Sequence, residues 1–344
     1  MPYTDYKKLK VGIVGAGLMG RWHAKLVTRQ GAKIIAIVDG NTTIAKQLAK
    51  EIDGTAQVFV DIDSMLADCQ LDVLHICTPL NSHFSLAMRA ISAGIHVIVE
   101  KPMAETAEET KLLLDASEKN NVKICPVHQF GFQDGVMKVI SEASSLGDLV
   151  HLRFTTGSAG GEGRGKAPLN EIIADIIPHP LSVLQRLCPH YSIDNLDWQG
   201  ISSCEGELQI MSNAGGVGLD IYISMNSRPT RCEMELFYTK GRAVLNFFHG
   251  YVVIEKGSVS RLQKMIQPFV FSLNEFFVAG INITKRIIKK ELAYPGLSYL
   301  IQDFYRTIIA EEKAPIKSSD SLAIAKIRNE IVSKYLPELS ESKK

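Results

Sequence analysis

The first third of the sequence alternates between two patterns. Short runs of β-branched residues are separated by segments in which apolar residues recur at helical spacing. This alternation predicts parallel βαβ units, whose strands are continuously apolar because helices cover both faces of the sheet. The expected strands are Val11–Val14, Ile34–Val38, Val73–Ile76, His96–Val99 and Val122–Cys125. Ligands of such sheets bind beyond the carboxyl ends of the strands, so functional residues are expected there.

The pattern changes after residue 128, where strand-like runs are joined by tight turns. The expected strands are Leu149–Thr156, Glu207–Ser212, Val217–Met225, Cys232–Tyr238, Arg242–Phe247 and Tyr251–Glu255, with helices at Leu169–Leu187, Leu297–Glu311 and Ser321–Tyr335. A length of 344 residues fits two domains. We therefore expect an α/β chain: a Rossmann parallel sheet in residues 1–128, then an α+β domain in residues 129–344. The second domain would carry a large, mostly antiparallel open sheet, and its C-terminal helices can pack back on the first domain.

Composition excludes several classes of protein. The chain has 38 basic and 37 acidic residues, so neither nucleic acid nor an anionic membrane is favoured as the main partner. The six cysteines form no CxxC pair and lie at no metal spacing, which predicts free thiols, a reducing compartment and no metal site. The N-terminus has no apolar signal region and no transmembrane segment is expected, so the cytoplasm is the expected location.

A GxGxxG motif directly follows the first expected strand and opens a helix, which is the context of a dinucleotide-binding turn. The first glycine permits the tight turn, the second lets the backbone approach a pyrophosphate, and the third allows close helix–strand packing. The helix N-terminus would bind the phosphates. A plain glycine-rich turn is the alternative. The candidate cofactor-binding residues here are Gly15, Ala16, Gly17, Leu18, Met19 and Gly20.

Asp39 ends the second expected strand, near the ~20-residue spacing of the acid that binds the ribose hydroxyl of NAD. A carboxylate there repels a 2′-phosphate, and the residues that follow are not basic. NAD is therefore favoured over NADP. The alternative is a helix N-cap, which Asp39 or Asn41 would provide.

The next two strand ends also carry polar loops punctuated by proline. After Ile76 the candidate residues are Cys77, Thr78, Pro79, Asn81 and His83, which would line the nicotinamide side of the cleft. After Val99 come Glu100, Lys101 and Pro102, of which Glu100 and Lys101 are also candidate cofactor-binding residues. A strand that merely ends in a charged loop is one interpretation. The other is that Lys101 is presented at the mouth of a cleft to handle a proton.

Asp175 and His179 are four residues apart in an apolar helical pattern, so they would share one face of a helix. A carboxylate can orient an imidazole, and the pair can then move a proton. A structural pair is equally compatible with these residues. Phe269–Leu292 has an apolar first part and a basic end, which suits core or oligomer packing and also a membrane-surface helix.

Taken in order, GxGxxG, Asp39, CTPxxxH, EKP and DxxxH resemble the glucose–fructose oxidoreductase, inositol dehydrogenase and rhizopine-catabolism (Gfo/Idh/MocA) family, over about residues 10 to 335. The resemblance implies hydride transfer between NAD(P) and a hydroxyl or carbonyl carbon of a sugar, nucleotide sugar or cyclic polyol. It implies that Lys101 transfers the proton, and that Asp175 and His179 bind substrate and assist catalysis. It also implies an α/β second domain for substrate binding and oligomerisation.

The sequence departs from the family pattern on the substrate side. Glycines often precede the DxxxH, where this chain has Leu169–Ile173, and an acid often follows the histidine, where it has Ser182. Arg164, in the glycine-rich run from Gly157 to Gly165, is a candidate anion contact, and a solvated turn is the alternative. The substrate itself is not predicted.

Two further functions stay open at this stage. Some members of the family use NAD without net turnover, cleaving glycosides or exchanging redox between two sugars. A non-catalytic NAD(H)-binding regulatory protein is the other. An open sheet with one apolar face favours pairing with another copy, so a homodimer or homotetramer is expected.

Overall fold

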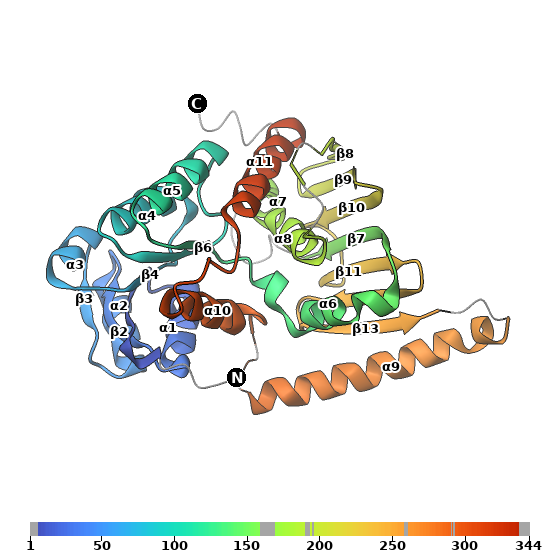
Figure 1. Ribbon diagram of the computed structural model, residues 1–344, viewed down its shortest axis with the longest axis horizontal. Coiled ribbons are helices and arrows are strands. Elements are labelled where there is room, and N and C mark those ends of the chain that lie inside the picture. Colours follow the sequence, from blue (N-terminus) through green and yellow to red (C-terminus); the bar gives the residue numbers. More distant parts are fainter. Residues whose placement is uncertain are drawn as a thin grey trace. The chain divides into compact units, whose positions relative to one another are not determined.

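The computed structural model describes residues 6–158, 169–189, 193–194, 196–257, 261–289, 291 and 293–336 (Figure 1). Contacts divide the chain into two units. The first comprises the residues up to Val127 together with Ser298–Lys326, and the second comprises His128–Leu297 and the residues from Ile327 onward. Each unit is built around one sheet. Arg164 lies outside the described residues.

The sheet of the first unit has six parallel strands in the order β3-β2-β1-β4-β5-β6. The strands are β1 (Lys10–Val14), β2 (Lys33–Val38), β3 (Gln57–Phe59), β4 (Val73–Ile76), β5 (His96–Val99) and β6 (Ile124–Pro126). The order reverses between β1 and β4, which is where such sheets bind ligands. This arrangement confirms the predicted Rossmann sheet. β3 was not predicted, because it is short and not fully buried.

Helices connect these strands: α1 (Leu18–Gln30), α2 (Thr42–Ile52), α3 (Ile62–Asp68), α4 (His83–Ser92) and α5 (Ala107–Lys119), with short 3-10 turns η1 (Tyr6–Lys8) and η2 (Leu80–Ser82). Asn41 caps α2 by accepting a hydrogen bond from the Thr43 N–H at 3.1 Å. Asp61 and Thr106 cap α3 and α5 in the same way. Almost all of α10 (Leu297–Ile309), which comes from the far end of the chain, also belongs to this unit.

The sheet of the second unit has seven strands in the order β13-β12-β11-β7-β10-β9-β8. The strands are β7 (Leu149–Gly157), β8 (Gln199–Ile201), β9 (Glu207–Ala214), β10 (Val217–Ser224), β11 (Arg231–Tyr238), β12 (Gly241–Asn246) and β13 (Tyr251–Lys256). Only β7 and β10 pair in parallel, so the predicted mostly antiparallel sheet is confirmed. Three-residue β8 was missed.

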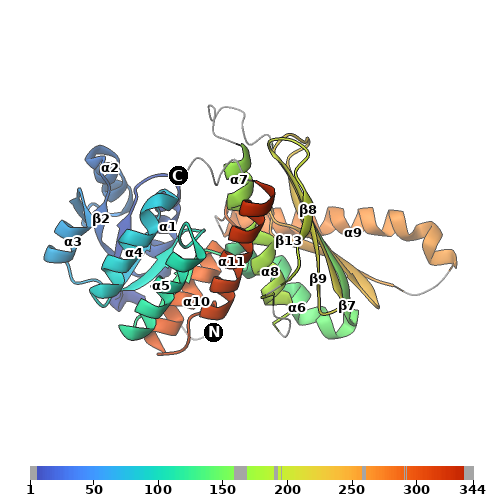
Figure 2. The same cartoon turned by 90° about the horizontal axis from the view of Figure 1, so that it is seen from above.

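Helices complete the second unit, which Figure 2 shows from above. They are α6 (Asp134–Leu146), α7 (Leu169–Ile176), α8 (Pro178–Leu187) and α9 (Arg261–Ile288), preceded by the short turn η3 (Gln129–Phe132); α11 (Ser318–Tyr335) is shared between the two units. α6 contacts β12 and β13, and α7 contacts β9 and β10. Within the described part of the chain, one segment, Met265–Ile288 of α9, is long and apolar enough to cross a membrane, judged by length and composition only.

We predict that His96, at the start of β5, makes stability fall in mild acid. Its Nδ1 accepts the Lys123 backbone N–H at 2.9 Å, and burial, followed by the charge of Lys123, lowers its pKa to about 4. An unfolded histidine has a pKa of about 6.5. The unfolded chain therefore binds the proton first, so stability is complete above about pH 6.5 and decreases as the pH falls towards 4.

His96→Asn keeps an acceptor for Lys123 but cannot titrate. We expect its free energy of unfolding, measured in urea across this pH range, to fall less steeply than that of the wild type. An equal slope in both proteins would contradict the assignment to His96.

Candidate active site

The glycine-rich turn between β1 and α1 has one glycine that the protein's own packing does not require. A Cβ on Gly15, whose φ is +93°, would lie 2.6 Å from the Cys77 carbonyl oxygen, and one on Gly20 would lie 1.8 Å from that of Gly15. These two glycines are therefore needed for packing. A Cβ on Gly17 would meet nothing within 4 Å. The space above Gly17 is open, as a turn that admits a phosphate requires.

The N-terminus of α1 can bind an anion. Its N-cap is Gly17, no side chain caps it, and its first turn has no acidic residue. Backbone N–H groups of a first helical turn lack intrahelical partners, and the helix dipole makes this end positive. This end of α1 therefore suits the phosphates of a dinucleotide.

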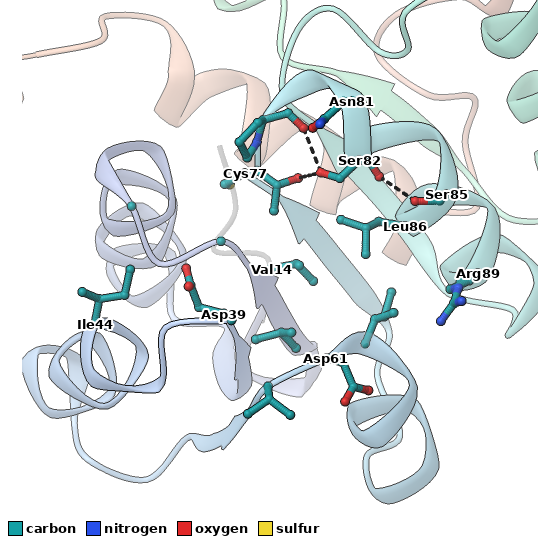
Figure 3. A pocket seen from close by; sticks show the side chains of 18 residues that line it. Val14, Asp39, Ile44, Asp61, Cys77, Asn81, Ser82, Ser85, Leu86 and Arg89 are labelled. Atoms are coloured by element: carbon teal, nitrogen blue, oxygen red, sulfur yellow. Dashed lines mark hydrogen bonds between the residues drawn. The ribbon is translucent and has the colours of Figure 1, made fainter. Parts of the chain in front are cut away.

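Asp39 forms the edge of a pocket of about 570 Å³ beyond the ends of β1, β2 and β4 (Figure 3). One carboxylate oxygen accepts the Ala16 N–H at 2.8 Å, and the other accepts the Asn41 N–H at 2.8 Å. The acid thus links the glycine-rich turn to the start of α2, and Asn41 rather than Asp39 caps that helix. Because each carboxylate oxygen has two acceptor sites, Asp39 can still bind a hydroxyl.

Half of the sequence-predicted cofactor residues of this unit line that pocket. They are Gly15, Gly17, Asp39, Cys77, Thr78, Pro79 and Asn81. The other half are not among its lining residues: Ala16, Leu18, Met19, Gly20, His83, Glu100 and Lys101. The sequence did not single out Asp61, Ser82, Ser85, Leu86 or Arg89, which also line it. These residues follow strand ends or lie on α4, and their helical spacing carries no signal for a ligand.

The loop after β4 is braced on both sides. The Ser82 hydroxyl donates to the Pro79 carbonyl at 2.8 Å, and its oxygen lies 2.7 Å from the Thr78 hydroxyl (Figure 3). His83 is buried, with one ring nitrogen 2.8 Å from the Thr78 carbonyl and the other 2.8 Å from that of Pro102. His83 therefore ties the CTPxxxH loop to the EKP loop.

Beneath the end of β5, a buried chain of side chains holds Glu100. His23 Nε2 lies 3.0 Å from a Glu100 carboxylate oxygen, the Nδ1 atoms of His23 and His75 are 2.7 Å apart, and His75 Nε2 lies 2.7 Å from the Tyr305 hydroxyl. Both histidines are fully buried. This chain was not predicted from the sequence.

One proton arrangement satisfies every link. Burial, and then His23, lowers the pKa of His75 well below its ordinary value, and burial raises that of Tyr305 well above its own. A neutral Tyr305 then donates to His75, His75 donates to His23, and His23 donates to the Glu100 carboxylate. Lys101, the next residue after Glu100, is half-buried. Cys77 is a neutral thiol, because burial, and then Glu100, raises its pKa well above the ordinary value.

In the second unit, Asp175 and His179 lie on two successive helices rather than on one. α7 ends at Ile176 and α8 begins at Pro178, so the expected continuous helix Leu169–Leu187 is interrupted. The reason is that Pro178 has no N–H to donate to the preceding turn. His179 is buried and its ring stacks on Phe130, with centroids 4.0 Å apart.

A second set of side chains holds the start of α7, and the sequence did not point to it. Asn170 accepts the Gly206 N–H at 3.0 Å, and Glu205 accepts the Leu169 N–H at 3.1 Å. Glu207 then accepts hydrogen bonds from the hydroxyls of Tyr222 at 2.9 Å and Ser224 at 2.6 Å. The first two contacts anchor the helix that carries Asp175 to the residues just before β9, and the Glu207 contacts join β9 to β10.

Comparison with known proteins agrees with this geometry. Residues 9–128 match the oxidoreductase family with an NAD-binding Rossmann fold. Over 121 residues, 35% of each chain, the sequence is 32% identical to inositol 2-dehydrogenase/D-chiro-inositol 3-dehydrogenase of Halalkalibacterium halodurans. The dinucleotide-binding part of the chain, residues 9–128, is therefore similar to the Gfo/Idh/MocA oxidoreductases.

Solved structures share the whole fold. UDP-N-acetylglucosamine 3-dehydrogenase from Acidithiobacillus ferrooxidans has a TM-score of 0.73 at 16% identity, covering 95% of this chain and 97% of that one. The WlbA dehydrogenase from Bordetella pertussis, solved with NADH and UDP-GlcNAcA, also has a TM-score of 0.73, at 15% identity and 96% coverage of both chains. By sequence, the chain spans 35% to 54% of the length of several curated relatives.

Two glycine substitutions should separate packing from ligand binding. Gly17→Ala puts a methyl group into open space, so the thermal unfolding midpoint should stay within about 2 °C of the wild type while dinucleotide affinity falls at least about tenfold. Gly20→Ala drives a methyl group into the Gly15 carbonyl and should destabilise the fold itself. Thermal unfolding and calorimetric titration with NAD measure both effects. Unchanged NAD affinity in Gly17→Ala would show that the dinucleotide does not approach this turn.

Asp39 should determine the choice between NAD and NADP. Asp39→Asn keeps an oxygen for the Ala16 N–H and removes the charge, so the ratio of affinities should shift towards NADP by roughly tenfold, about 1.4 kcal/mol. Asp115→Asn, which removes one exposed charge on α5 outside the pocket lining, is the matched control and should leave the ratio unchanged. If the ratio of NAD to NADP affinities were the same in both variants, Asp39 would not determine the choice of cofactor.

Proposed function

We propose that this chain is an NAD-dependent oxidoreductase that transfers hydride between the nicotinamide and a hydroxyl or carbonyl carbon of a sugar, nucleotide sugar or cyclic polyol. The observation that carries the proposal is the open turn at Gly17, which faces a pocket edged by the Asp39 carboxylate. The pocket, at about 570 Å³, is within the ~300–1,000 Å³ typical of cofactor sites. The names of the relatives, dehydrogenases of inositols and UDP-sugars, support the substrate class.

The residues present fit NAD. The turn from Gly15 to Gly20 and the first turn of α1 would hold the pyrophosphate, and Asp39 would accept a hydrogen bond from the adenosine ribose. The loop from Cys77 to Asn81 would line the pocket beside the nicotinamide half. When bound, the nicotinamide supplies the hydride acceptor or donor, and the protein supplies position and charge.

In the proposed mechanism Lys101 accepts the proton of the substrate hydroxyl in the oxidation direction and returns it in the reduction direction. A lysine takes up a proton only as the neutral amine. Glu100, held through His23, fixes the backbone from which Lys101 extends. The proton therefore leaves the hydroxyl oxygen for the Lys101 nitrogen while the hydride leaves the carbon.

Asp175 and His179 complete the proposed catalytic set. His179 would hydrogen-bond the same hydroxyl and share its proton with Lys101, and Asp175 would bind a neighbouring hydroxyl or orient the imidazole. The stacked Phe130 restricts the His179 ring to one plane, which favours a defined hydrogen-bond direction. We further propose a cytoplasmic enzyme that works as a homo-oligomer.

Removing the Lys101 amine should abolish proton transfer without affecting the cofactor. A screen of sugars, inositols and UDP- or dTDP-sugars with NAD, followed by reduced-nicotinamide absorbance, first identifies a substrate. With it, Lys101→Ala should lower kcat by about a hundredfold to ten-thousandfold, with unchanged NAD affinity by calorimetry.

The matched control is Lys111→Ala, which removes an exposed lysine paired with Asp115 on α5. It should leave kcat unchanged. Full turnover in Lys101→Ala would remove Lys101 from the mechanism and leave the dinucleotide site intact.

A further inference from the structure

Helix α9 turns its apolar side away from the unit to which it belongs. Its large exposed side chains all fall within about half of the helix circumference, at 3.6 residues per turn. They are Met265, Ile266, Phe269, Val270, Leu273, Phe276, Phe277, Ile281, Ile283, Ile287 and Ile288, and each is about half or more exposed. We call this surface the outer stripe. A surface helix normally buries such a stripe, so the orientation of α9 is the reverse of the usual one.

Polar side chains on the opposite side of α9 hold the helix in this orientation. Gln267 donates to the Glu255 carboxylate at 3.3 Å, Asn282 to the His249 carbonyl at 2.8 Å, and Arg286 to the same carbonyl at 3.3 Å. The Arg242 guanidinium carbon lies 5.7 Å from the centroid of the Phe271 ring. Figure 1 shows the helix beside β13, and the contacts at Gln267 and Asn282 secure it at two well-separated points.

The charges near the stripe are almost all positive. Within the described side chains of α9 and the residue after it, the basic residues are Lys285, Arg286 and Lys289, which stand at the C-terminal end of the apolar segment. Glu275 is the only acidic residue in this range. It is half-buried on the inner side, where its charge adds to burial in raising the pKa of Tyr251.

This charge distribution disfavours pairing of the stripe with its copy. Two α9 helices side by side and parallel bring their basic C-terminal ends together, and no acid in the stripe compensates. The outward face of β7, β10, β11 and β12 in a second copy is also a poor partner for the stripe, because it carries a network of ion pairs. The network consists of Arg153, Asp220, Glu235 and Arg242. Anionic lipid headgroups complement the basic C-terminal end, and acyl chains complement the apolar residues of the stripe.

We propose that α9 docks this chain on an anionic membrane surface, lying in the plane of the interface with its outer stripe in the acyl boundary. Twenty-four residues would be long enough to span a bilayer. However, the hydrogen bonds from Gln267 and Asn282 keep the helix along its own unit. A helix that lies on the surface keeps these bonds, whereas one that crosses the bilayer must break them. This inference goes beyond the proposed oxidoreductase activity and does not depend on it.

Flotation of the full chain with lipid vesicles tests the proposal. The chain should float with vesicles of phosphatidylcholine mixed with phosphatidylglycerol, bind phosphatidylcholine alone far more weakly, and lose anionic binding in high salt. Leu273→Gln should weaken binding at least about tenfold. The matched control, Leu112→Gln, removes an equally exposed leucine from α5 and should change nothing.

The basic end has its own variant. Lys285→Gln with Lys289→Gln leaves Arg286 and its bond to His249, and should weaken anionic binding by about fivefold for each lysine. Circular dichroism and NAD affinity should match the wild type in every variant, because the altered side chains are exposed. Equal binding to neutral and anionic vesicles would contradict the proposal. The proposal would also be contradicted if the chain did not float with vesicles and instead formed an oligomer that Leu273→Gln dissociates. That result would show that the stripe binds a second copy.

Discussion

The position of Glu100 depends on a buried hydrogen-bond chain that runs through His23 and His75 to Tyr305. Its four members come from the end of β5, from α1, from β4 and from α10, so each secures a different element of the first unit. Inside a protein, removing one partner from such a chain leaves a buried polar group unsatisfied, at a cost of ~1–3 kcal/mol. The network therefore fixes the strand end from which Lys101 extends, although it contributes no group to the pocket beside Asp39.

The parts of this structure that follow from local pattern were predictable. The strands of the Rossmann sheet, the turn at Gly15–Gly20 and the acid at Asp39 are each encoded by a few neighbouring residues. β3 and β8 were missed because each is only three residues long and has no buried residue. The break between α7 and α8 was visible in principle, since Pro178 stands between Asp175 and His179, but the four-residue spacing suggested a single helix.

Contacts between distant residues could not be predicted in this way. His75 and Tyr305 are separated by 230 positions, and nothing near either residue indicates the other. The sequence also shows that α9 is apolar on one side without showing which side faces the protein. That depends on carbonyl and carboxylate acceptors, on His249 and Glu255, which exist only when the β-strands are in place. The site residues of the two units remain predictions drawn from motif order and family resemblance.

The route of the chain has a consequence for how the protein is made. The first unit contains residues up to Val127 and then Ser298–Lys326, so it is interrupted by most of the second. On a ribosome the six parallel strands emerge long before α10, and during that interval His75 has no Tyr305 to bind. The dinucleotide-binding unit therefore cannot reach its final form until the second sheet has been synthesised, although chains generally fold from the N-terminus onward. A stop codon anywhere before α10 would therefore leave the first unit incomplete, because it would lack α10.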